Sequence, residues 1–93
     1  MGESVNRRIL ITGALGQIGM ELLDALQTKF GSENVIASDI RESEDVDDSG
    51  FRYEKLDVLD SERMESIIRY NNINEVYHLA ALLSATGEKN PQL

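Results

Sequence analysis

The sequence has 93 residues, of which 41% are hydrophobic and 28% charged, with nine basic against seventeen acidic side chains. The resulting net charge of -8 opposes binding to a phosphate backbone, so we expect no nucleic-acid partner. The sequence has no cysteine and one histidine, which excludes thiolate and histidine-rich metal sites. It also has no apolar run near the roughly 20 residues of a membrane span, so we expect no membrane contact. The start of the chain lacks the apolar core of a signal peptide, so the expected location is the cytoplasm.

An apolar strand that leads into three glycines is the central feature of the sequence. Residues 9–11 form an unbroken run of branched apolar side chains, as in strands of parallel sheets that are buried on both faces. Gly13, Gly16 and Gly19 follow at intervals of three. Such glycines allow a sharp turn, a close approach to a pyrophosphate and tight packing of a helix on a strand, and the helix N-terminus attracts phosphate. The pattern predicts a dinucleotide site.

The spacing of apolar residues predicts the next elements. Hydrophobic residues at intervals of three or four indicate a helix over 17–30, and Gly31 stands where a positive φ would end it. A strand over 35–39 follows. Residues 41–50 are rich in Asp and Glu, and we interpret them as a solvated, mobile loop. The alternative, a cation site, lacks the glycine and the final Glu of an EF-hand loop at the required positions.

The second half of the chain continues the alternation of strands and helices. Residues 51–55 alternate as in a half-buried edge strand, Asp60 can cap a helix from 61 to about 71, and residues 73–79 indicate a fourth strand. Parallel neighbours need crossover connections, and these are almost always right-handed. The sequence therefore predicts an incomplete, Rossmann-like, doubly wound α/β sheet with the strand order 3-2-1-4.

Asp39 ends the second predicted strand 20 residues after Gly19. An acidic residue at this distance from the glycines can accept hydrogen bonds from the adenosine ribose hydroxyls, and its charge repels a 2′-phosphate. NAD is therefore favoured over NADP. Arg41 favours NADP instead, because a cation two residues after Asp39 can hold the 2′-phosphate.

Three further positions follow strands at the same predicted edge of the sheet. Asp57 follows the third strand and can accept from the adenine amino group, or it can stabilise the turn into the next helix. His78 ends the fourth strand and alone is more typical of a structural histidine than of a catalyst. Ala80 and Ala81 are small enough to let a cofactor lie close to the backbone, although alanines also serve helix–sheet packing.

Two segments carry a family resemblance. Residues 12–19, Thr-Gly-Ala-Leu-Gly-Gln-Ile-Gly, resemble the glycine motif of the extended short-chain dehydrogenase/reductases, the superfamily of NAD-dependent epimerases and dehydratases. Residues 78–81, His-Leu-Ala-Ala, are similar to the fourth-strand signature of that superfamily. Segments 16–19, 37–41 and 81–88 look like those of the NAD-dependent L-threonine 3-dehydrogenases of this type.

This resemblance implies an NAD site and a small-molecule substrate, an amino acid, for the longer enzyme. The glycines would cradle the pyrophosphate, Asp39 would hold the ribose, and Ser84 would lie near the amino-acid group of the substrate. A homodimer is the assembly that it implies. The implied cofactor-binding residues are Gly13, Gly16, Gln17, Ile18, Gly19, Asp39, Ile40, Arg41, Asp57, Val58, His78, Ala80 and Ala81.

The chain departs from the family in one respect. The catalytic Tyr-x-x-x-Lys is absent, since none of the three tyrosines is followed by lysine four residues later. We therefore expect residues 1–93 to be a single N-terminal NAD-binding domain, a partial Rossmann fold, which is inactive alone because the catalytic portion lies elsewhere. Two alternatives stay open: the NAD-binding half of a nucleotide-sugar epimerase or dehydratase, and a non-catalytic nucleotide-binding module.

Overall fold

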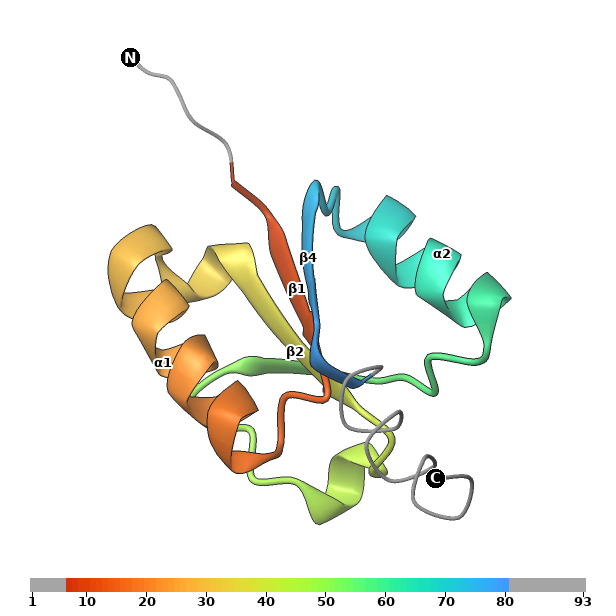
Figure 1. Cartoon of the computed structure of the whole chain (residues 1–93), viewed down its shortest axis with the longest axis horizontal. Helices are drawn as coiled ribbons and strands as arrows, with labels where there is room; N and C mark the ends of the chain where they lie inside the picture. The colour runs from red at the N-terminus through yellow and green to blue at the C-terminus, as the bar shows by residue number, and fades with distance from the viewer. Residues whose placement is uncertain (1–6, 81–93) are drawn as a thin grey trace, which may run out of the picture.

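The computed structural model describes residues 7–80, which form a parallel sheet with one helix against each face (Figure 1). The four strands are β1 (Ile9–Thr12), β2 (Val35–Asp39), β3 (Arg52–Lys55) and β4 (Glu75–His78). They pair in parallel in the order β3-β2-β1-β4. The predicted α/β class and the predicted strand order are confirmed.

The helices begin and end near the predicted residues. Helix α1 spans Gln17–Phe30 and is followed by Gly31, which has a φ of +94°. Helix α2 spans Ser61–Tyr70, and the Asp60 carboxylate caps it by accepting from the backbone N–H of Arg63 at 3.1 Å. Short 3₁₀ turns, η1 (Ser32–Asn34) and η2 (Ser43–Asp45), follow α1 and β2.

The fourth strand is shorter than predicted. It begins at Glu75 instead of residue 73, and it ends at His78, because Leu79 and Ala80 already have helical backbone conformation. An apolar residue such as Leu79 suits the end of a buried strand and the first turn of a helix equally well, so the pattern did not separate the two.

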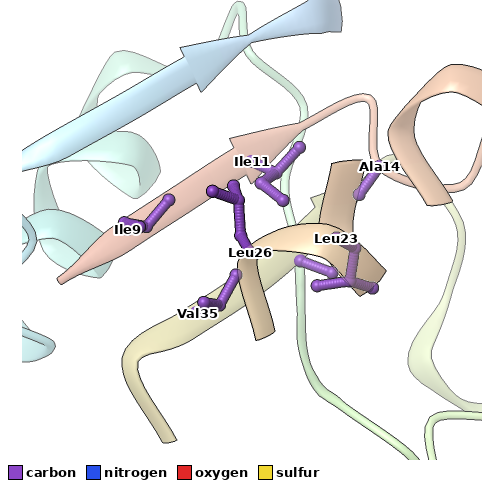
Figure 2. Close-up of a cluster of buried hydrophobic side chains, with 7 residues drawn as sticks. Ile9, Ile11, Ala14, Leu23, Leu26 and Val35 are labelled. Atoms are coloured by element: carbon purple, nitrogen blue, oxygen red, sulfur yellow. The ribbon is translucent and has the colours of Figure 1, made fainter. Parts of the chain in front are cut away.

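Alternate residues of the central strands enter two different cores. On the α1 face, Ile9 and Ile11 pack with Leu23 and Leu26 of the helix, as Figure 2 shows. On the α2 face, Leu10 packs with a second cluster that includes Ile36, Leu56, Ile67 and Ile73. Both faces of β1 are therefore buried, and this rigid strand fixes where the glycine turn starts.

The acidic segment 41–50 lies at the surface. Each of its residues is exposed except Val46, which is half-buried. Within residues 7–80, no group of three or more His, Asp or Glu side chains is arranged to hold a metal ion. No helix in the same part of the chain is long and apolar enough to cross a membrane.

Candidate functional site

The predicted site residues come together at one edge of the sheet. Gly13 follows β1, Asp39 ends β2 and His78 ends β4. Thr12 pairs in register with Ser38 of β2 and with His78 of β4. Because the strands are parallel, their carboxyl ends meet at this edge, where open α/β sheets bind ligands.

Two of the three glycines are required by the protein's own backbone. Gly13 has a φ of +69°, and a Cβ there would lie 2.7 Å from the backbone nitrogen of Ala80. Gly19 is buried in α1, where a Cβ would lie 2.6 Å from the carbonyl oxygen of Ala14. Gly13 thus permits the turn and the close approach of the segment after β4, and Gly19 permits the packing of α1 on the turn.

Gly16 differs from both. It is the N-cap of α1 with φ -75° and ψ 173°, an extended conformation that any residue adopts. Its position has no side-chain cap, and the first turn of α1 carries no acidic residue. The positive end of the α1 dipole is therefore not compensated by a carboxylate of that turn, and Gln17 and Ile18 beside it are exposed.

Asp39 connects the end of β2 to the glycine turn. One carboxylate oxygen accepts from the backbone N–H of Leu15 at 3.0 Å, and the other accepts from the N–H of Ile40 at 2.7 Å. The side chain is half-buried, whereas Ile40 and Arg41 are exposed. The contact with Leu15 was not foreseen from the sequence, because strand spacing alone does not show which backbone donor a carboxylate meets.

Tyr53 of β3 contacts the end of β2 and the segment that follows it. Its hydroxyl lies 3.0 Å from the carbonyl oxygen of Asp39 and 2.7 Å from that of Arg41. Burial, with a further contribution from the negative charge of Asp39, raises the pKa of Tyr53 to about 12. The hydroxyl therefore keeps its proton at neutral pH and acts as a donor.

Asp57 and Val58 lie in the segment between β3 and α2. Asp57 is exposed, and its carboxylate accepts from the backbone N–H of Leu59 at 3.0 Å. This bond corresponds to the turn-stabilising alternative, and it leaves lone pairs for a ligand. Val58 is half-buried against the α2-side core. Their role beside adenine stays a prediction.

A buried threonine organises the junction of β1 and β4. Thr12 is fully buried, and its hydroxyl accepts from the backbone N–H of Ala80 at 3.2 Å. The same oxygen lies 2.9 Å from Nδ1 of His78. This contact ties the exposed His78 ring to the end of β1, as the structural interpretation of His78 expects. A polar residue at the end of an otherwise apolar strand was the available signal for Thr12.

Thr12→Val is expected to lower the free energy of unfolding by about 1 to 3 kcal/mol, since it keeps the shape but leaves the Ala80 N–H without its acceptor. Urea unfolding followed by circular dichroism measures the loss. Thr28→Val, at an exposed position of α1, is the control and should change stability little. Equal stability of the two variants would show that the Thr12 network contributes nothing.

The remaining predicted residues divide into two groups. Ala80 is half-buried and lies against Gly13 through its backbone. Ala81 and Ser84 lie outside the described residues, as does the whole segment 81–88, one of the three that resemble those of the threonine dehydrogenases.

Comparison with known proteins agrees with this geometry. Residues 9–92 match the family described as the NAD dependent epimerase/dehydratase family. An uncharacterised epimerase/dehydratase of Staphylococcus aureus (strain USA300) is 49% identical over 88 residues, which cover 94% of this chain and 27% of that relative.

Solved structures of L-threonine dehydrogenases share the fold. A monomeric L-threonine 3-dehydrogenase from a metagenome, in its apo form, is 54% identical with a TM-score of 0.75, over 89% of this chain and 26% of that one. A GalE-like L-threonine dehydrogenase from Cupriavidus necator, in its holo form, is 44% identical with a TM-score of 0.77, over 91% of this chain and 27% of that one.

These matches confirm the resemblance to the short-chain dehydrogenase/reductase superfamily. The chain spans about a quarter of the length of the proteins it matches, 27% in the case of the curated relative. The glycine turn, the acidic residue that ends β2 and the parallel sheet are all within the matched part. The chain belongs to the NAD-dependent epimerase/dehydratase family.

Proposed function

We propose that residues 1–93 form a single NAD-binding domain of an oxidoreductase that oxidises the 3-hydroxyl of L-threonine. The observation that carries the cofactor assignment is Gly16. Its backbone conformation does not need glycine, and it stands at the N-terminal end of α1, whose first turn carries no acidic residue and where a side chain would stand between the helix and an anion. The similarity to L-threonine dehydrogenases, at 44% to 54% identity in two of them, supports the substrate.

The residues at the carboxyl edge of the sheet fit a dinucleotide. Gly16, Gln17 and Ile18 would hold the pyrophosphate, with the first N–H groups of α1 as donors. Asp39 would hold the adenosine ribose, since both of its oxygens retain lone pairs beside the bonds from Leu15 and Ile40.

The flanking residues would complete the site. Ile40 and Val58 would contact adenine, with Asp57 as an acceptor for its amino group. His78, Ala80 and Ala81 would line the channel toward the nicotinamide, and Ser84 would lie near the amino-acid group of the substrate. The negative charge of Asp39 favours NAD, while Arg41 would favour NADP.

This chain would supply the cofactor-binding residues of the reaction but not its Tyr-x-x-x-Lys pair. Bound NAD would supply the acceptor for a hydride from the substrate. This chain orients the cofactor through the glycine turn and Asp39, but it has no tyrosine followed by lysine four residues later that would move the substrate proton. We therefore expect the chain alone to bind NAD without turnover.

Gly16→Ala tests the cofactor assignment. We expect the variant to stay folded and its affinity for NAD to fall about tenfold or more, which corresponds to about 1.4 kcal/mol. NAD titration followed by the amide spectra of ¹⁵N-labelled protein measures both. The wild type should show shifts at residues 13–19 and 39.

Gly50→Ala is the matched control for this titration, because a Cβ at Gly50 would have no neighbour within 4 Å. It should bind NAD as the wild type does. A folded wild-type chain whose glycine-turn and Asp39 signals do not respond to NAD would overturn the assignment.

A nucleotide-sugar epimerase or dehydratase is the second candidate, because the matching family and the Staphylococcus aureus relative carry that description. Assays of the longest natural protein that contains this chain, with threonine and with UDP-sugars, distinguish the two. NAD binding without turnover of either would favour the non-catalytic module.

We propose a homodimer for the longer enzyme. One similar structure is described as monomeric, and sedimentation of the longer enzyme decides between the two states.

A further inference from the structure

The turn that follows β2 is held by β3. Tyr53 pairs in register with Ala37, and Lys55 pairs with Asp39. The Tyr53 hydroxyl has one proton to share between two carbonyl oxygens, at 2.7 Å from Arg41 and 3.0 Å from Asp39. The Asp39 carbonyl also accepts from the N–H of Leu56 at 2.7 Å. The hydroxyl bond is therefore directed mainly to the carbonyl of Arg41.

The Tyr53 ring is itself fixed. It packs edge-on against Phe51, with ring centroids 6.5 Å apart, and against the α1-side core. One position beyond Arg41, the Glu42 carboxylate forms an ion pair with Lys55 at 2.7 Å. That pair is exposed and adds little free energy, so of the two side-chain contacts from β3 to residues 41 and 42, the one made by the half-buried Tyr53 contributes more.

We propose that Tyr53 is a positioning residue for the ribose-binding turn, residues 39–42, and that it helps set the preference for NAD over NADP. The inference rests on the proposed function, because it needs Asp39 to be the ribose ligand. The hydroxyl fixes the backbone from which the carboxylate of Asp39 and the cation of Arg41 project. If the carbonyl of Arg41 is released, the cation gains freedom to approach a 2′-phosphate, while Asp39 is still held by the N–H of Leu15 and by its pairing with Lys55.

Tyr53→Phe tests this inference, because it keeps the ring and removes only the hydroxyl. We expect faster amide hydrogen exchange at residues 40–42 and an NAD-to-NADP affinity ratio that falls about three- to tenfold, the range for the loss of one hydrogen bond. Tyr77→Phe is the matched control. Tyr77 packs on the same face of the sheet, and its hydroxyl bonds Glu75 at 3.2 Å instead of this turn.

The outcomes separate a positioning role from a structural one. Faster exchange confined to residues 40–42, with unchanged urea stability and a reduced NAD preference in Tyr53→Phe alone, supports the inference. Unchanged exchange in this turn overturns it, as does an equal loss of affinity for both cofactors. If the wild type binds neither cofactor, the proposed function fails, and so does the claim on cofactor preference; the exchange data then decide whether Tyr53 anchors the turn.

Discussion

Gly19→Ala is expected to lower the free energy of unfolding by about 3 kcal/mol or to prevent folding, since a domain of this size has only about 5 to 10 kcal/mol in total. The added Cβ would lie 2.6 Å from the carbonyl oxygen of Ala14, 2.7 Å from its Cα and 2.7 Å from the carbonyl oxygen of Gly13. All three are backbone atoms of the glycine turn. A shift of α1 away from the turn would expose Leu23 and Leu26, which fill the core on that face (Figure 2).

Helix propensity works against this loss and is too small to reverse it. Replacing glycine with alanine inside a helix gains about 1 kcal/mol. Gly50→Ala is the control, since a Cβ there meets no atom within 4 Å. Urea unfolding monitored by circular dichroism compares the two variants. A Gly19→Ala chain as stable as Gly50→Ala would mean that α1 does not pack on the turn as the structure shows.

The elements that the sequence predicted most accurately are those in which several signals agree. Helix α1 and strand β2 have the predicted bounds, because hydrophobic period, flanking turn residues and Gly31 indicate the same boundaries. The strand order followed from the same pattern, since short connections and right-handed crossovers leave few arrangements.

The hydrogen-bonding partners at the site could not be predicted in the same way. Pattern and period show which face a residue occupies, but not which donor meets which acceptor in three dimensions. The Asp39 carboxylate meets the N–H of Leu15, 24 positions away, and the Thr12 hydroxyl meets the N–H of Ala80, 68 positions away. The sequence therefore predicts Asp39 as the ribose ligand but does not predict the backbone N–H of Leu15 that the same carboxylate holds.

This second bond of Asp39 changes the expected effect of removing its charge. From the sequence alone, Asp39→Ala is expected to spare the fold and only weaken the discrimination against NADP. In the structure, loss of the carboxylate also frees the N–H groups of Leu15 and Ile40, so alanine loosens the glycine turn. Asp39→Asn is the better test, because the amide oxygen can still accept from one of the two N–H groups.

Asp39→Asn is expected to weaken NAD binding about tenfold or more and to leave NADP binding unchanged or improved. NAD binding weakens because charge-assisted bonds to the ribose, worth about 1.5 to 3 kcal/mol, are lost. NADP binding does not weaken in the same way, because the repulsion between the carboxylate and the 2′-phosphate is removed. Asp48→Asn, at an exposed position of segment 41–50, makes the same change in net charge and should alter neither affinity. Calorimetric titration of both cofactors into both variants gives the ratio. If the NAD preference of Asp39→Asn equals that of Asp48→Asn, Asp39 does not bind the ribose, and its contact with Leu15 accounts for an acidic residue at this position.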